Sequence, residues 1–216
     1  MSELIIIAGP QAAGKSTAIT NLDLQFRSAR ALFPQKQVPA LMALQESRQI
    51  IVHKNMLLGA QFMDVTDERE IPRCDFSRMD KMIAQNHKRL VYVDECNIFT
   101  LAHAEAHGIA SLRRHWSRYL RYLKQLDAKV IFLDVPPDVS WERRRERYEQ
   151  RLIYFPESQH QSIMKGYRDY LDRIHPLLHK LYNKLPLPKI LLDARVSLKA
   201  FNEEFTRAFT DLSVFF

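Results

Sequence analysis

Short, unbroken runs of apolar residues recur along the chain, and longer segments of mixed polarity separate them. The runs are Leu4–Ala8, Leu90–Val93, Val130–Val135 and the shorter Ile190–Leu192. Runs without polar alternation predict strands that are buried on both faces, as in a parallel sheet. Strands of this kind that alternate with helices predict a single α/β domain covering residues 1–216.

The segments between these runs carry apolar residues at helical spacing. Helices are predicted in Leu112–Leu126 and in the long amphipathic stretch Gln159–Leu185, and a third in Ser16–Arg30, directly after a glycine turn. A further strand is expected in Gln37–Leu44, although Pro39 disfavours a central place in the sheet.

Composition narrows the function classes. The 216 residues are 46% apolar and 26% charged, which excludes a disordered or fibrous chain. Lysine and arginine outnumber acids by 32 to 25, and this excess favours anionic partners such as nucleotides, nucleic acid or a membrane surface. Two isolated cysteines exclude a disulfide framework. The sequence shows neither a basic leader followed by a long apolar stretch nor an apolar run long enough to span a membrane. A cytoplasmic protein is therefore expected.

The segment Gly9–Thr17 carries the most specific chemistry. It matches G-x-x-x-x-G-K-[ST], with an apolar strand before it and a helical segment after it. Such a loop turns successive backbone N–H groups toward a phosphate, and its lysine and hydroxyl serve the β/γ-phosphates and Mg²⁺. The residues predicted to bind the nucleotide here are Gly9, Gln11, Ala12, Ala13, Gly14, Lys15, Ser16 and Thr17.

Two carboxylates, Asp94 and Glu95, end the second apolar run. Open α/β sheets bind ligands at the carboxyl ends of their strands, and adjacent strand residues point to opposite faces. We therefore expect the two carboxylates to differ in role. Asp94 is expected to hold Mg²⁺ together with Ser16, and Glu95 or Asp94 to act as a base or to orient a water. Which of the two is the base stays open.

An arginine-rich segment follows the third run. Five arginines fall between Arg143 and Arg151, and on a helix Arg143, Arg147 and Arg151 form one stripe. Arginine forks pair with phosphate oxygens, so this stripe could close over a nucleotide. The alternative is a solvated helix, in which the interleaved glutamates pair with the arginines.

Other candidates carry weaker signals. His103 and His107 stand four residues apart, but Glu105 is misplaced for H-E-x-x-H, and pocket-lining or surface histidines are favoured over metal ligands. Glu46 and Arg48, after the weak second strand, are candidates to bind an acceptor. Outside the arginine stripe the basic residues are mixed with acids, which argues against a nucleic-acid surface.

The order of these motifs resembles that of the P-loop nucleoside and nucleotide kinases. The motifs that carry the resemblance are the strand with its G-x-x-x-x-G-K-S loop, the V-D-E strand end, V-I-F-L-D-V-P-P, the arginine segment, the long helix Tyr167–Tyr182 and L-L-D-A. The likeness is greatest to the deoxynucleoside kinase and thymidylate kinase group. The resemblance implies a three-layer α/β/α fold, a five-stranded parallel sheet, a LID of about residues 140–158, and ATP and Mg²⁺ as cofactors. One departure is Glu95, which stands where that group usually has arginine; it weighs more against a monophosphate acceptor than against a hydroxyl.

Three functions remain open. The first is an ATP–Mg²⁺ phosphotransferase acting on a small nucleoside- or nucleotide-like acceptor, with Lys15, Asp94, Glu95, Arg143 and Arg147 in catalytic roles. The second is a kinase of the same architecture with another acceptor, such as a nucleotide-sugar, as in zeta-type toxins, or a nucleic-acid end. The third is an ATPase or switch module with no acceptor but water. A nucleic-acid-binding protein without catalysis ranks last.

Overall fold

The computed structural model describes residues 3–15, 17–18, 76, 90–94 and 97–212. Within them, four parallel strands form one sheet in the order β2-β1-β3-β4. The strands are β1 (Glu3–Ala8), β2 (Leu90–Asp94), β3 (Ala128–Asp134) and β4 (Lys189–Asp193). Each apolar run thus forms a strand where it was predicted, with its ends shifted by at most two residues. The further strand expected in Gln37–Leu44 lies outside the described residues.

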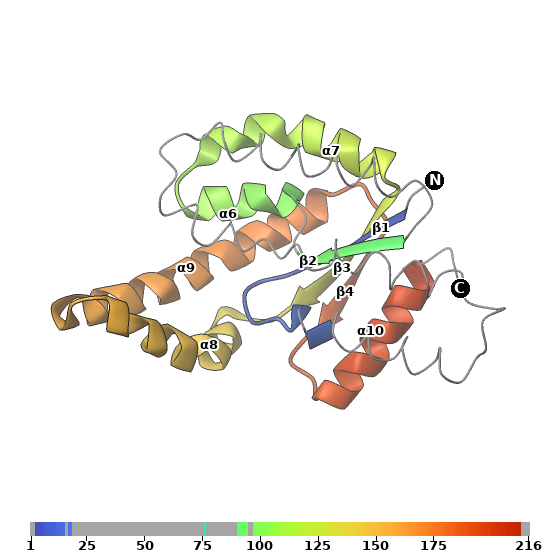
Figure 1. Cartoon of the computed structure of the whole chain (residues 1–216). Coiled ribbons are helices and arrows are strands. Elements are labelled where there is room, and N and C mark those ends of the chain that lie inside the picture. Colours follow the sequence, from blue (N-terminus) through green and yellow to red (C-terminus); the bar gives the residue numbers. More distant parts are fainter. Residues whose placement is uncertain (1–2, 16, 19–75, 77–89, 95–96, 213–216) are drawn as a thin grey trace.

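The described helices lie between β2 and β3, between β3 and β4, and after β4 (Figure 1). They are the 3₁₀ helix η1 (Asn97–Phe99), α6 (Thr100–Ala106), the 3₁₀ helix η2 (Ala110–His115), α7 (Trp116–Gln125), α8 (Pro137–Arg151), the 3₁₀ helix η3 (Leu152–Tyr154), α9 (Glu157–Lys184) and α10 (Leu198–Leu212). The helix predicted in Leu112–Leu126 is α-helical from Trp116, and its first turn is 3₁₀. Of the helix expected over Ser16–Arg30, residues 17 and 18 are described, and both are helical.

Strand β1 occupies the middle of the sheet and has helices on both sides (Figure 1). Leu4 and Ile6 point to one face, where they join a core with side chains of α6, α7 and α9. Ile5 and Ile7 point to the other face and pack with α10. All four side chains are at most 1% exposed, which explains the unbroken apolar run: each face of β1 is covered by helices.

The order of the strands places a topological switch point at the end of β1. The chain goes from β1 to β2 on one side and then crosses to β3 on the other side of β1. The connections that leave β1 and β3 therefore start at the same edge of the sheet. In open α/β sheets this switch point is where ligands bind. None of the described helices, including the long α9, combines the length and apolarity that crossing a membrane requires.

Candidate functional site

The loop that follows β1 has a backbone shaped for close approach. Gly9, Ala12 and Gly14 all have positive φ, at 143°, 59° and 90°. A Cβ on Gly9 would lie 2.2 Å from the backbone oxygen of Leu133 in β3, so only glycine fits at this position. Ala12 takes the left-handed conformation despite its side chain, a cost of about 1–2 kcal/mol. Strain of this kind is concentrated in ligand-binding turns.

Lys15 is the first helical residue after the loop and is only 8% exposed. Its Nζ donates hydrogen bonds to the backbone oxygens of Gly9 and Pro10, each at 2.9 Å. The ammonium group therefore lies against the inner side of the loop. Residues 15, 17 and 18 are helical, so the positive end of the backbone dipole adds to the charge of Lys15 and this place favours an anion.

One face of α8 rests on the loop at Gln11. Ser140 Oγ donates to the backbone oxygen of Gln11 at 2.7 Å, Arg144 Nη1 donates to its Oε1 at 3.1 Å, and the Tyr148 hydroxyl also donates to Oε1. These three residues stand at four-residue intervals and share one face of the helix. Burial raises the pKa of Tyr148, so its hydroxyl remains a donor at neutral pH. Pro137 in the first turn starts the helix directly after β3, and this short connection holds α8 at the loop.

Arg143 connects the loop with the end of β4. Its Nη1 donates to the backbone oxygen of Ala12 at 3.2 Å, and its Nη2 donates to that of Ala194 at 2.8 Å. Of the stripe singled out in the sequence, Arg143 thus reaches the loop, whereas Arg147 and Arg151 are exposed on α8 and make no hydrogen bond within the described part of the chain. Arg144, which is not part of that stripe, is the arginine that contacts the Gln11 side chain.

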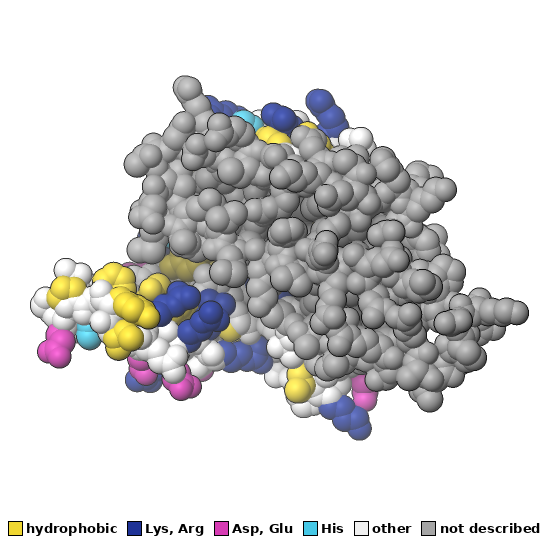
Figure 2. Space-filling view, viewed as in Figure 1, with side chains coloured by type: hydrophobic (Ala, Val, Ile, Leu, Met, Phe, Trp, Pro, Cys, Tyr) yellow, Lys and Arg dark blue, Asp and Glu magenta, His cyan; other side chains and the backbone are white. Residues whose placement is uncertain are grey.

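Segment 140–158, expected as a LID, consists of α8 from Ser140 on, η3 and the start of α9. The α8–α9 hairpin projects from the body of the molecule (Figure 1). Figure 2 shows Lys and Arg side chains gathered on this hairpin. At its far end Ile153 and Tyr154 are exposed. The outer arginine Arg145 pairs with Glu149 at 2.8 Å, the solvated arrangement that the alternating charges also predicted.

The remaining predicted site residues are placed only in part. The backbone of Asp94 ends β2 and aligns with Ile7 of β1, two residues before the loop. Ala13 is buried against the α10 core, and Thr17 is exposed. The side chain of Asp94 lies outside the described structure, as do the whole of Ser16, Glu46, Arg48 and Glu95.

A second polar cluster lies at the end of β3, and sequence reasoning missed it. The Asp134 carboxylate contacts His175 and His179 of α9 at distances of 3.2 and 2.7 Å. The two histidines stand four residues apart, the same signal that drew attention to His103 and His107. That earlier pair faces Tyr170 instead: His103 Nδ1 bonds to its hydroxyl and the His107 ring lies against its ring.

Two charges flank this second cluster. Asp193, at the end of β4, accepts hydrogen bonds from the Arg195 guanidinium through both carboxylate oxygens. These bonds and the one from the Arg195 backbone lower the pKa of Asp193 to about 2. Burial, followed by the charge of Arg173, lowers the pKa of His107, so this more distant histidine is neutral at pH 7.

Neither a known protein-family model nor a curated protein matches the sequence. Two solved structures of deoxyadenosine kinase from M. mycoides do match, one with bound dATP and one with bound dCTP. Each has a TM-score of 0.54 and 14% identity; the matches cover 97% and 96% of this chain and 100% and 99% of the kinase. A structure of YorR protein from Bacillus subtilis, in complex with phosphorylated GDP, follows at a TM-score of 0.49, with 16% identity over 97% of this chain and 96% of that one. At this identity the likeness shows the fold alone: the chain has the α/β fold of the nucleoside kinase that it matches.

Proposed function

We propose that the chain is an ATP- and Mg²⁺-dependent kinase that transfers phosphate to a small nucleoside- or nucleotide-like acceptor. The observation that carries this proposal is the loop at the end of β1, with positive φ at Gly9, Ala12 and Gly14 and the buried ammonium group of Lys15 against it. The full-length match to a deoxyadenosine kinase with bound dATP or dCTP supports a nucleoside-like ligand. The proposal includes one cytoplasmic domain, 1–216, with a fifth parallel strand and a LID at about residues 140–158.

The β- and γ-phosphates of ATP would occupy the concave side of the loop. Lys15 would exchange its bonds to the Gly9 and Pro10 oxygens for phosphate oxygens, and backbone N–H groups between Gln11 and Thr17 would add donors. The same exchange is open to Arg143, whose present acceptors are two backbone oxygens. Arg147 and Arg151 project from the same helix and would reach the phosphates when the hairpin closes.

The residues around the loop also fit Mg²⁺. Ser16 follows Lys15 directly, and Asp94 ends the strand beside β1, so a hydroxyl and a carboxylate oxygen, ligands that Mg²⁺ prefers, belong to adjoining segments. Ser16 and Asp94 would hold the ion. When bound, it would neutralise negative charge on the β- and γ-phosphates.

In the transfer itself, Asp94 or Glu95 would accept the proton of an acceptor hydroxyl. The freed oxygen forms a bond to the γ-phosphorus, the bond between that phosphorus and the β–γ bridging oxygen breaks, and ADP leaves. Arg143 and Arg147 would stabilise the charge that spreads over the phosphoryl oxygens. Glu46 and Arg48 remain the proposed contacts to the acceptor.

Product analysis with γ-labelled ATP tests the proposal. The purified protein is incubated with Mg²⁺ and one acceptor at a time: nucleosides, nucleoside monophosphates, nucleotide-sugars and nucleic-acid ends. The proposal predicts a labelled nucleoside or nucleotide product. Label in a nucleotide-sugar or a nucleic-acid end would assign the fold to another acceptor, and release of inorganic phosphate alone would identify an ATPase or switch.

A thermal-shift screen of the same compounds gives an independent measurement. A ligand at 100 times its dissociation constant adds about 2.7 kcal/mol to the free energy of unfolding. We expect the largest upward shifts with ATP–Mg²⁺ and with the true acceptor.

A further inference from the structure

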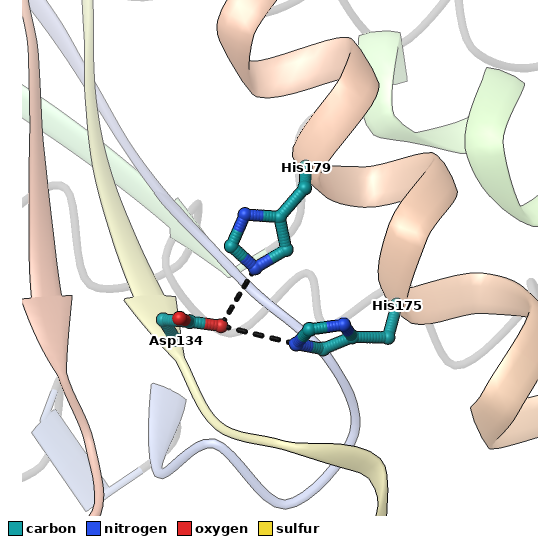
Figure 3. Close-up of side chains that lie close together, drawn as sticks. All are labelled: Asp134, His175 and His179. Carbon is teal, nitrogen blue, oxygen red and sulfur yellow. Dashed lines mark hydrogen bonds and ion pairs between the residues drawn. The ribbon is translucent and has the colours of Figure 1, made fainter.

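The polar cluster at the end of β3 is compact and combines two kinds of metal-binding group. Asp134 is the last residue of β3, and His175 and His179 lie one helical turn apart on α9 (Figure 3). Both imidazoles turn their Nε2 atoms toward the same carboxylate oxygen, at 3.2 and 2.7 Å. The three ligand atoms lie within 4.8 Å of one another.

The surroundings of the cluster leave it accessible but sheltered. The side chains of His175, His179 and Asp134 are 23%, 27% and 30% exposed. The ring of Phe132 meets His179 edge to face, with ring centroids 5.3 Å apart, and the two imidazole centroids are 4.6 Å apart. An ion could therefore enter from solvent, and an apolar side chain backs one of its ligands.

The guanidinium group of Arg195, which is attracted to Asp134, is already engaged elsewhere. Arg195 has a weak attraction to Asp134, but its Nε and Nη2 donate to Asp193 at 2.7 to 3.0 Å. The Asp134 side chain thus faces two imidazoles, which can either donate hydrogen bonds to it or, as neutral rings, share a cation with it.

We propose that Asp134, His175 and His179 form a binding site for a divalent transition-metal ion of the zinc class. Zinc bonds of about 2.0–2.2 Å to nitrogen and oxygen place tetrahedral ligand atoms about 3.3 Å apart. The Asp134–His175 pair already has this spacing, and the Asp134–His179 pair would open by about 0.6 Å. Three protein ligands leave a fourth position, which water can fill from the exposed side.

This site is distinct from the proposed magnesium site in ligand chemistry. Imidazole suits zinc and its neighbours in the transition series, whereas magnesium prefers oxygen ligands. It is also distinct in position, because its ligands come from β3 and α9 rather than from the loop after β1. An ion here would join α9 to the strand end whose backbone oxygen accepts a hydrogen bond from Ala194, the same residue that Arg143 contacts.

Titration of the metal-free full-length chain with Zn²⁺ alone, in competition with a chromophoric chelator, tests the site. Asp134→Asn keeps an oxygen that can accept hydrogen bonds but removes the charge, and His179→Ala removes one imidazole. We expect either change to weaken Zn²⁺ binding by about 100-fold or more, since even residues behind the ligands are worth 10- to 100-fold. Co²⁺ bound to the wild-type chain should give visible absorption bands of low-coordinate geometry that both variants lack.

Two controls separate this site from the rest of the molecule. His160→Ala removes a half-buried histidine of the same helix, one that contacts the Phe155 backbone, and should leave Zn²⁺ affinity unchanged. Lys15→Ala should also bind Zn²⁺ normally, whatever happens to ATP. Equal Zn²⁺ affinity in wild type and Asp134→Asn, or no stoichiometric binding to the wild-type chain, would overturn the proposal and leave a hydrogen-bonded cluster. Thermal unfolding of each metal-free variant checks that it is folded.

Discussion

The loop after β1 and the cluster after β3 lie at the ends of neighbouring strands, yet they suit opposite charges. The loop uses its backbone: positive φ at Gly9, Ala12 and Gly14 shapes it, and Lys15 and Arg143 add positive charge. The cluster uses side chains alone and offers a carboxylate oxygen and two ring nitrogens. A site made from backbone depends on local conformation, whereas a site made from side chains depends on which elements pack together.

The largest effect is expected when the conformation of the loop is removed. Gly9→Ala places a methyl group 2.2 Å from the backbone oxygen of Leu133 and strains φ at 143°. Backbone strain and overpacking together should cost roughly 3 kcal/mol or more of the free energy of unfolding. Urea unfolding measures this loss, and nucleotide binding should disappear with it.

Gly108→Ala is the matched control for backbone strain. Gly108 also has positive φ, at 82°, but nothing lies within 4 Å of the position of its Cβ. Its substitution should therefore cost only about 1–2 kcal/mol and leave nucleotide binding intact. If the two alanines cost the same, close packing of the loop on β3 does not matter.

The next effect concerns the arginines of α8. Arg143→Ala removes both hydrogen bonds between the loop and the end of β4 and, in the proposed mechanism, a phosphate ligand. Bonds from a charged donor are worth about 1.5–3 kcal/mol, so kcat/KM for ATP should fall about tenfold to 100-fold. Steady-state kinetics of the purified variant provides the measurement.

Arg145→Ala tests whether the decrease in kcat/KM expected for Arg143→Ala comes from the position of the arginine on the helix rather than from its charge. Arg145 is on the same helix but pairs with Glu149 in solvent. Surface pairs of this kind contribute little, so its loss should leave kcat/KM within about twofold. A similar decrease in both variants would point to a general effect of positive charge.

The loop and the cluster also differ in how well each could be predicted from the sequence. The loop was predictable because its residues are contiguous and each has a required conformation or charge. The strands were predictable because burial on both faces demands unbroken apolar runs. Asp134 and the two histidines are 41 and 45 residues apart, so only the packing of α9 on the end of β3 brings them together.

The two histidine pairs show that residue spacing alone does not predict a binding site. Both pairs have a spacing of four residues and lie on helices, but His103 meets a tyrosine hydroxyl whereas His179 meets a carboxylate. The residue that packs against the histidines, not their spacing, decides whether the pair can bind a metal ion. The face of α8 that meets the loop also depends on packing. It carries Ser140, Arg144 and Tyr148, and the spacing of the arginines alone did not predict this face.

A small effect, dependent on pH, is expected at Tyr148. Burial raises its pKa above the usual 10.0, because ionisation of a buried phenol is unfavourable. The stabilising contribution is complete below pH 10.0 and is lost as pH rises through the higher pKa of the folded state. Tyr148→Phe, which lacks the titrating group, should unfold with a shallower dependence above that pH.

At neutral pH the same variant loses one hydrogen bond to Gln11, while Arg144 still contacts the Gln11 side chain. The cost should be about 0.5–1 kcal/mol. Thermal unfolding between neutral pH and pH values above 10.0 separates the two contributions. Parallel curves for wild type and variant would show that Tyr148 ionises as easily in the folded chain as in the unfolded one.

Transfer of γ-labelled phosphate by the wild-type chain and by Lys15→Ala, with Mg²⁺ and the best acceptor of the panel, tests the central claim most directly. We predict ATP-dependent labelling of a nucleoside- or nucleotide-like acceptor by the wild type. Lys15→Ala should lose this activity while its thermal unfolding stays cooperative. Undiminished transfer by a folded Lys15→Ala variant, or no transfer to any acceptor by the wild type, would contradict the assignment of the loop after β1 as the site of phosphoryl transfer.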